Sequence, residues 1–257
     1  MAVEGKLSGT AAVVTGASSG IGEATARGLA AQGADVALLA RRGDRIEALA
    51  AELSEGGVRA LPIEADVSDR EQAESAVARA AGELGRLDVV VNNAGVMLLG
   101  AILEAPVEEW EQMVEVNLLG LLYVSKAALP HLLSAAESEP RRVADLVNVS
   151  SVAGRVARLG SGVYNATKHG VGAFSESLRQ EVTGRHVRVS LIEPGAVATE
   201  LVSHNRPEVQ ERIEARLGDI DQRLAAADIA DAISYVVTRD RHIAINEVLI
   251  RPTGQTG

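Results

Sequence analysis

Tyr164 and Lys168 stand four positions apart, in the segment Tyr164-Asn165-Ala166-Thr167-Lys168. On a helix, side chains at positions i and i+4 share one face, so the phenol and the ammonium are expected to lie close together. A free phenol has a pKa of about 10 and is a poor base at neutral pH, but a neighbouring cation favours the phenolate. The pair therefore predicts proton transfer by Tyr164.

A glycine-rich turn at residues 15–22 follows a short apolar run and begins a helical pattern. Its glycines are Gly16, Gly20 and Gly22, in the spacing G-x3-G-x-G. Such a turn lets the backbone approach a diphosphate closely, while the helix N-terminus supplies N–H groups and a positive dipole. Ser18 and Ser19 are suited to capping that helix. Taken by itself, the turn is equally compatible with an ordinary strand–helix connection.

The end of the second apolar run indicates which dinucleotide the turn would hold. An NAD-specific site usually has an acidic residue here, which binds the ribose 2′-OH. In this chain Ala40 stands at that place, and Arg41 and Arg42 follow it. Two guanidinium groups suit a 2′-phosphate, which they bind through paired hydrogen bonds. A solvated helix start is the alternative, and it explains Arg42 alone better than the pair. We therefore predict NADP(H) in preference to NAD.

Polar residues also follow the next two apolar runs. The Asp66 carboxylate is placed to accept a hydrogen bond from an adenine amino group, or else Asp66 or Ser68 caps the next helix. Residues 92–95, Asn-Asn-Ala-Gly, form a polar turn at the expected carboxyl edge of the sheet, where such folds bind ligands.

Ser151 and Asn117 are compatible with a part in the same chemistry. Ser151 follows the apolar run 143–149, so its hydroxyl can reach the edge that Tyr164 faces; a turn or cap serine is the alternative. Asn117 lies within the apolar stretch 114–124, where an amide is costly unless it is hydrogen-bonded. It is either a structural amide, which the residues alone favour, or the anchor of a water-linked proton path.

Short β-branched runs alternate with longer amphipathic ones, the pattern of a parallel sheet with crossover helices. Predicted strands are 11–15, 35–39, 58–64, 88–91, 143–149, 187–192 and 247–250; predicted helices are 20–32, 45–55, 70–84, 107–134, 162–183 and 228–237. Because strands occur from residue 11 to residue 250 without a linker, we expect one α/β domain over 1–257. It would be a doubly wound (Rossmann) parallel sheet of seven strands with helices on both faces. The charge-rich segment 196–224 is predicted to be a mobile lid.

The composition argues against several classes of protein. The chain has no cysteine, which excludes disulfides, thiolate catalysis and cysteine-ligated zinc. Its net charge of −10 argues against nucleic-acid binding. No uninterrupted apolar run reaches about 18 residues, and residues 1–6 lack an apolar signal core. We therefore expect a cytoplasmic protein with a small-molecule substrate and no nucleic-acid, membrane or metal partner.

Together these motifs resemble the short-chain dehydrogenase/reductase family over essentially the whole chain. The resemblance implies that Tyr164 is the general acid/base, that Ser151 polarises the substrate carbonyl, and that Lys168 lowers the Tyr164 pKa and binds the nicotinamide ribose. Asn117 would anchor a proton relay. The predicted cofactor-binding residues are Gly16, Ser18, Ser19, Gly20, Ile21, Gly22, Arg41, Arg42, Asp66, Val67, Asn93, Ala94, Gly95, Tyr164, Lys168, Pro194, Gly195, Val197 and Thr199.

More narrowly, residues 97–100, 117–120, 174–182 and 192–195 resemble members that reduce clavulanate-9-aldehyde with NADPH. The ending 246–253 is shared with those members and with a related group that oxidises serine and 3-hydroxy acids. That resemblance favours a small carbonyl or alcohol substrate bearing a carboxylate. The expected pocket walls carry Arg155, Arg158, His204 and Arg206. An arginine there could bind the carboxylate, with solvated loop arginines as the alternative.

The family resemblance also implies a homotetramer, or a homodimer, packed through the long helices 107–134 and 162–183. A hypothesis from another class is a dinucleotide-binding regulator that has lost catalysis. Such a regulator has no need of Ser151, Tyr164 and Lys168 together, so their joint presence favours the enzyme.

Overall fold

The computed structural model describes residues 5–218 and 220–255 of the 257-residue chain. Residues 1–4, on which part of the argument against a leader sequence depends, lie outside the described part. So do residue 219 of the predicted lid and residues 256–257 of the predicted domain.

Within the described residues, seven strands form one sheet in the order β3-β2-β1-β4-β5-β6-β7, and neighbouring strands are parallel. The strands are β1 (Ala11–Thr15), β2 (Asp35–Ala40), β3 (Ala60–Glu64), β4 (Val89–Asn92), β5 (Ala144–Val149), β6 (Val187–Pro194) and β7 (Glu247–Ile250). The order reverses between β1 and β4, which creates a crevice at their carboxyl ends. The predicted doubly wound Rossmann fold is confirmed.

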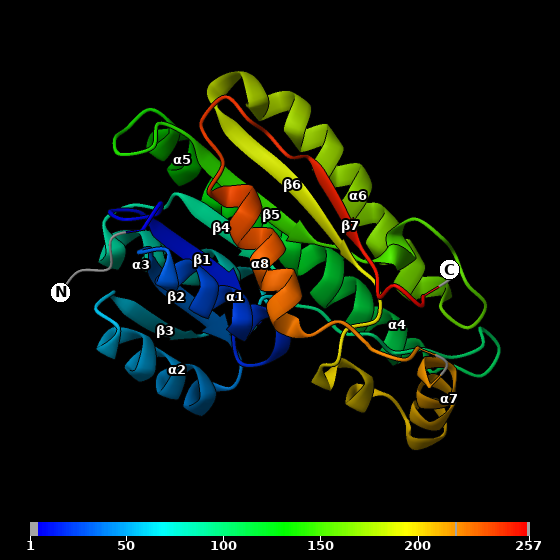
Figure 1. Ribbon diagram of the computed structural model, residues 1–257. Coiled ribbons are helices and arrows are strands. Elements are labelled where there is room, and N and C mark those ends of the chain that lie inside the picture. The colour runs from blue at the N-terminus through cyan, green and yellow to red at the C-terminus, as the bar shows by residue number, and fades with distance from the viewer. Residues whose placement is uncertain (1–4, 219, 256–257) are drawn as a thin grey trace.

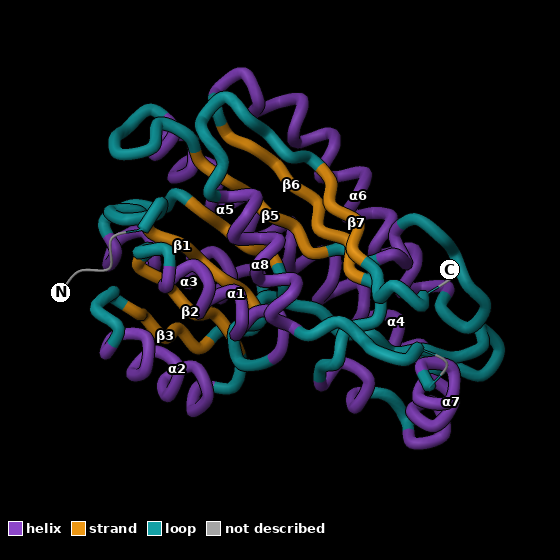
Figure 2. Tube along the Cα trace, viewed as in Figure 1, coloured by secondary structure: helices purple, strands orange, loops and turns teal. Residues whose placement is uncertain are grey.

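Helices connect the strands and cover both faces of the sheet (Figures 1 and 2). The α-helices are α1 (Gly20–Ala31), α2 (Gly43–Glu55), α3 (Arg70–Leu84), α4 (Val107–Val114), α5 (Leu121–Ala136), α6 (Gly162–Val182), α7 (Pro207–Leu217) and α8 (Ala226–Val237). The shorter helical turns are η1 (Glu115–Gly120), η2 (Val152–Gly154), η3 (Thr183–Arg185) and η4 (Glu200–His204).

Two apolar layers hold the helices against the sheet. Successive strand side chains point to opposite faces. Val13 belongs to the layer that contains α3, α5 and α6, whereas Val14 belongs to the layer that contains α1, α2 and α8. Alanine, valine, leucine and isoleucine fill both layers, as the aromatic content of 2% requires.

The helix predicted over 107–134 is divided, whereas the other predicted elements agree with the structure to within two residues. α4 and α5 flank η1, a π-helical turn that contains Asn117. π turns are rare and frequently lie at functional sites. Hydrophobic periodicity did not reveal this one because the apolar pattern continues through it.

The second difference is α7, which lies inside the segment predicted as a lid. Pro207 occupies its first helical position, where proline is favoured because its missing N–H would have no partner there. The dipeptide Arg206-Pro207 is therefore a sequence signal for this helix.

The run Val107–Ala136, which joins α4, η1 and α5, is long and apolar enough to span a membrane by length and composition, with a mean hydropathy of 1.3. Core helices of globular proteins meet the same criterion. Val124, Ala128 and Leu132 are fully buried in the layer that contains α3 and the sheet. This run is a core helix.

Candidate active site

A cavity of about 440 Å³ lies along the carboxyl ends of the strands. It brings together Gly16 after β1, Asp66 after β3, Asn93 after β4 and Ser151 after β5. All of the predicted catalytic and cofactor-binding residues line this cavity except Gly22 and Asn117, which lie behind its wall. The topology thus collects residues that are far apart in the sequence.

The turn between β1 and α1 requires glycine for reasons of conformation and space. Gly16 and Gly20 have φ angles of +65° and +56°, which L side chains rarely adopt. A Cβ at position 22 would lie 2.2 Å from the carbonyl oxygen of Gly16 and 2.5 Å from Asn93 Nδ2. The turn therefore presents bare backbone to the cavity at the start of α1, which fits a diphosphate.

Arg42 binds the two serines of this turn. Its guanidinium donates to Ser18 Oγ from Nε and Nη2, at 3.1 and 2.9 Å, and from Nη2 to Ser19 Oγ at 2.7 Å. Ser19 is the N-cap residue of α1, but its side chain makes no capping hydrogen bond. The expectation that these serines cap α1 is therefore wrong for Ser19, because the hydroxyl faces the guanidinium instead.

Asp66 makes a local turn and does not cap α3. Its carboxylate accepts hydrogen bonds from the N–H and the hydroxyl of Ser68, at 3.0 and 2.7 Å. The cap is Asp69, which accepts from the N–H of Gln72 at 3.0 Å. The capping alternative for Asp66 and Ser68 is thus wrong. Asp66 Oδ2 lies 3.9 Å from Arg41 at the edge of the cavity.

Hydrogen bonds of Asn93 connect the turn after β4 with the turn after β1. Its amide Nδ2 donates to the carbonyl oxygen of Thr15 at 3.0 Å, and the Thr15 hydroxyl accepts from the N–H groups of Asn93 and Ala94 at 2.9 and 3.0 Å. This asparagine supports the wall of the cavity at the point where the strand order reverses.

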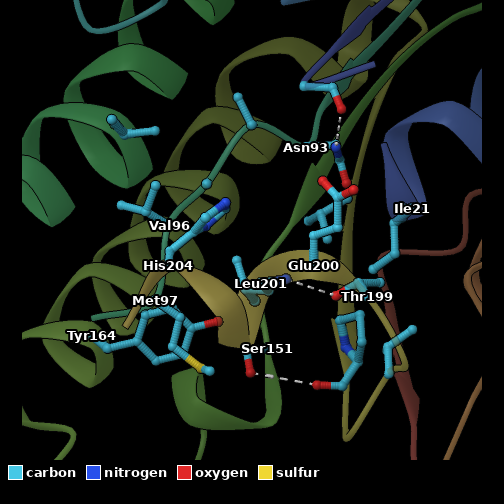
Figure 3. Close-up of a pocket in the computed structure, with 18 of the residues that line it drawn as sticks. Ile21, Asn93, Val96, Met97, Ser151, Tyr164, Thr199, Glu200, Leu201 and His204 are labelled. Carbon is cyan, nitrogen blue, oxygen red and sulfur yellow. Dashed lines mark hydrogen bonds between the residues drawn. The ribbon is translucent and has the colours of Figure 1, made fainter. Parts of the chain in front are cut away.

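The side chains of Tyr164 and Ser151 lie near each other in the cavity (Figure 3), where the Ser151 hydroxyl donates to the carbonyl oxygen of Pro194 at 3.4 Å. Tyr164 comes from α6, and its ring packs among Val96, Leu98 and Met113. Ser151 stands at the start of η2, where its hydroxyl also accepts from the N–H of Ala153 at 3.1 Å. A carbonyl oxygen bound between the two hydroxyls would receive two hydrogen bonds.

Lys168 lies one turn further along α6, as the spacing predicted. Its ammonium donates to the carbonyl oxygen of Val149 at 3.0 Å and lies 5.8 Å from the centroid of the Tyr164 ring. The side chain is buried, and burial lowers the pKa of Lys168 to about 8. The ammonium is still the major form at pH 7.

The pKa of Tyr164 moves in the direction opposite to the expectation. Burial raises it to about 12, and the nearby hydroxyl of Ser151 opposes this only in part. A buried phenolate loses hydration, and the ammonium of Lys168 is directed at Val149 rather than at the phenol. In the protein alone, Tyr164 therefore keeps its proton, which is the form that can donate to a carbonyl oxygen.

Asn117 forms a pair of hydrogen bonds with the backbone of Val96. Its Oδ1 accepts from the Val96 N–H and its Nδ2 donates to the Val96 carbonyl oxygen, both at 2.8 Å. The side chain is buried within η1, and Oδ1 would lie 3.2 Å from a Cβ placed on Gly95. These hydrogen bonds agree with the interpretation of Asn117 as a structural amide, because they hold the cavity wall in place near Lys168.

Two of the three arginines considered as partners of a substrate carboxylate form ion pairs outside the cavity. Arg155 Nε donates to Glu193 at 2.8 and 2.9 Å and the guanidinium also contacts Glu247, while Arg206 binds Glu109 and Glu208 at 3.0 Å. Neither arginine lines the cavity. Apart from Arg206–Glu208, these ion pairs join residues distant in sequence, so no local pattern predicted them.

Arg158 and His204 do line the cavity. The pKa of His204 is lowered by burial and then by the positive charges of Arg42 and Arg41, so this histidine is neutral at pH 7. Arg158 is half-buried, and of the three arginines it is the one that lines the cavity.

Asn205 joins the segment predicted as a lid to the opposite wall. Its side chain accepts from the N–H of Leu99 at 2.7 Å and donates to the carbonyl oxygen of Met97 at 2.8 Å. Asn205 was not among the residues predicted from the sequence. Its position before Arg206-Pro207, at the start of a helix, is the signal that could have found it.

Comparison with known proteins agrees with this architecture. The sequence model of the short chain dehydrogenase family matches residues 10–210. An uncharacterized oxidoreductase of Staphylococcus aureus is 35% identical over 241 residues, 94% of this chain and 96% of that protein. This chain belongs to the short-chain dehydrogenase/reductase family.

Other proteins similar to this dehydrogenase include a much longer chain and solved structures with different bound cofactors. The glycine betaine reductase of Emericella nidulans is 41% identical over 251 residues, 97% of this chain, but the chain spans only 19% of that protein. A serine dehydrogenase solved with NADP+ has a TM-score of 0.87 and 32% identity, and the match covers 96% of this chain and 97% of the other. Further solved structures at 25–32% identity hold NADP, NADH or NAD.

Proposed function

We propose that this dehydrogenase transfers hydride between NADP(H) and the carbonyl or alcohol carbon of a small substrate. The observation that carries the proposal is that the hydroxyls of Tyr164 and Ser151 line the same cavity as the glycine turn and Arg42. The nicotinamide ring, when bound, supplies or accepts the hydride.

The side chains of the cavity would supply orientation and the proton. In the reducing direction, the Tyr164 hydroxyl donates its proton to the substrate oxygen, and the Ser151 hydroxyl holds that oxygen by a second hydrogen bond. Lys168 places a positive charge beneath the phenol, which stabilises the phenolate left after the proton has moved. Asn117 acts indirectly, by holding the backbone of Val96 at the cavity wall.

Two features favour NADP(H) over NAD(H). The buried end of β2 carries Ala40 where an NAD-specific site needs a carboxylate, and Arg41 and Arg42 follow it at the cavity. The similar serine dehydrogenase holds NADP+. Because other similar structures hold NADH or NAD, the comparison of the two cofactors is the first test.

We further propose that the substrate bears a carboxylate, bound by Arg158. The walls around Tyr164 are apolar, with Val96, Met97 and Val152 facing the cavity, so a charged substrate needs a specific partner. Arg158 can provide it through paired hydrogen bonds. Serine, 3-hydroxy acids and carboxylated aldehydes such as clavulanate-9-aldehyde belong to this class. The segment 196–224 would cover such a substrate, since Leu201, Val202 and Ile213 line the cavity.

Initial rates with NADPH and NADH, across aldehydes and ketones with and without a carboxylate, test both proposals. We expect faster turnover with NADPH and with carboxylated substrates. Tight NADPH binding without turnover of any reactive aldehyde would instead support the dinucleotide-binding regulator.

The variant Arg158→Ala tests the carboxylate partner directly. Loss of a charged hydrogen-bonding partner should raise KM for carboxylated substrates roughly 10-fold or more and leave KM for uncharged aldehydes within about threefold. Arg155→Ala is the matched control, because its ion pairs with Glu193 and Glu247 lie outside the cavity; it should alter stability but not KM. An unchanged KM in Arg158→Ala contradicts the proposal.

A further inference from the structure

Glu200 brings a carboxylate to the arginines predicted to bind the cofactor. It is the first residue of η4 and follows Thr199. Its Oε2 lies 2.9 Å from Arg42 Nη1, and its Oε1 lies 2.9 Å from Arg45 Nη1. Glu200 lines the cavity, and Figure 3 shows its side chain among the lining residues.

The surroundings of Glu200 are strongly positive. Arg41 and Arg42 line the same cavity, and Arg45 stands at its rim in an adjoining hollow that Glu200 also lines. The hydrogen bonds from Arg42 and Arg45 lower the pKa of Glu200 to about 2. The carboxylate is therefore ionised under all ordinary conditions and neutralises part of this positive cluster.

The hydrogen-bond donors of Arg42 are already in use, although a phosphate could bind the same donors. Its guanidinium lies against the hydroxyls of Ser18 and Ser19 in the glycine turn and against Glu200 in the same arrangement. A planar guanidinium binds a carboxylate and a phosphate with the same donors. An anionic oxygen of the protein thus occupies a donor of Arg42 that a phosphate oxygen could use.

We propose that Glu200 is an intramolecular competitor for the 2′-phosphate of NADP(H) and so sets the affinity and selectivity of the site for that cofactor. This inference rests on the proposed NADP(H) dependence. A phosphate dianion that reaches Arg42 must displace the carboxylate, because two anions at one guanidinium repel each other. NAD(H) carries a hydroxyl at the same place, which can donate a hydrogen bond to Glu200 and leaves its ion pairs intact.

The variant Glu200→Gln isolates the charge, since glutamine keeps the size and an accepting oxygen. The probes are NADPH, NADH and adenosine 2′,5′-bisphosphate, with dissociation constants measured by calorimetry. We expect NADPH and the bisphosphate to bind roughly three- to tenfold more tightly to Glu200→Gln than to the wild type, which lies within the range for the two exposed ion pairs that Glu200 makes. NADH should change by less than about twofold.

Glu208→Gln is the matched control, because it removes a carboxylate of the same segment that pairs with Arg206 instead. It should leave all three dissociation constants unchanged. An equal gain for NADH and NADPH in Glu200→Gln would show a general charge effect and overturn the inference. Weaker NADPH binding would also overturn it, by showing that Glu200 organises Arg42 and Arg45 for the phosphate.

The same dissociation constants test the proposed cofactor and the proposed role of Glu200 separately. The wild-type preference for NADPH over NADH tests the proposed cofactor, whereas the ratio between Glu200→Gln and wild type tests Glu200. A wild type that prefers NADH contradicts the cofactor proposal. A wild type that prefers NADPH, with an unchanged ratio in the variant, contradicts only the role of Glu200.

Discussion

Burial acts on Tyr164 and Lys168 in the same sense, because it favours the neutral form of each. It raises the pKa of the phenol to about 12 and lowers the pKa of the ammonium to about 8. A site that donates a proton needs the neutral phenol, so the environment of Tyr164 suits carbonyl reduction. The same burial has a free-energy cost for Lys168, because its ammonium stays charged with little hydration. Its hydrogen-bond acceptor is the carbonyl oxygen of Val149.

This cost predicts a pH dependence of stability. A lysine with a pKa of about 8 in the folded protein and 10.5 in the unfolded chain binds fewer protons when folded, so the free energy of unfolding rises with pH between these values. Relative to Lys168→Met, the wild type should gain roughly 2–3 kcal/mol from pH 7 to pH 10. Tyr164 acts in the opposite sense only above pH 10, since its pKa in the folded protein is the higher one.

Urea unfolding at several pH values measures this difference. The exposed Lys126 provides the control, and Lys126→Met should follow the wild-type profile. If the profiles of Lys168→Met and wild type run parallel from pH 7 to pH 10, the ammonium of Lys168 carries no burial cost and the argument fails.

At the scale of elements, the turn between β1 and α1 depends on the absence of a side chain at Gly22. An added methyl group would overlap the carbonyl of Gly16, which belongs to the turn itself and cannot move without distorting it. We expect Gly22→Ala to destabilise the fold by about 1–3 kcal/mol and to weaken NADPH binding more than tenfold. Thermal unfolding and calorimetric titration measure the two effects.

Gly82 in α3 is the control for this substitution, since a Cβ there meets nothing within 4 Å and its φ is not positive. Gly82→Ala should stabilise the protein by roughly 0.5–1 kcal/mol, through helix propensity, with no effect on cofactor binding. Equal effects of the two substitutions would contradict the packing argument.

The sequence indicated the elements well because each carries its own pattern. The bounds of β1, β7 and α3 agree with the predictions, since alternation, a glycine stop or an amphipathic run defines them locally. The π turn around Asn117 and the ion pair of Arg155 with Glu193 could not be predicted in this way. They depend on contacts between segments that meet only after the sheet has formed.

The site shows the same division between local and long-range information. Spacing alone placed Tyr164 and Lys168 on one face of α6 and the glycines at the start of α1. The direction of the Tyr164 pKa depends on burial, and the partner of Arg42 lies 158 residues away, so neither follows from a motif.

At the scale of the whole molecule, the local charge at the cavity is opposite in sign to the net charge of the chain. The chain carries −10, yet Arg41, Arg42 and Arg45 gather at one end of the cavity. A local positive field of this kind attracts a polyanionic cofactor to an otherwise acidic protein. The homotetramer or homodimer, the cytoplasmic location and the movement of the segment 196–224 stay predictions.

The central claim is that Tyr164 delivers the proton to the substrate oxygen, while the other side chains of the cavity hold the cofactor. Tyr164→Phe removes only the hydroxyl from a ring that packs among apolar side chains, so the fold and the NADPH site should persist. The decisive measurement is the rate of NADPH oxidation by Tyr164→Phe with the best aldehyde substrate, alongside the dissociation constant for NADPH. We predict a loss of roughly 10²- to 10⁴-fold in kcat, with the dissociation constant within about threefold of wild type. Wild-type turnover in this variant would contradict the account.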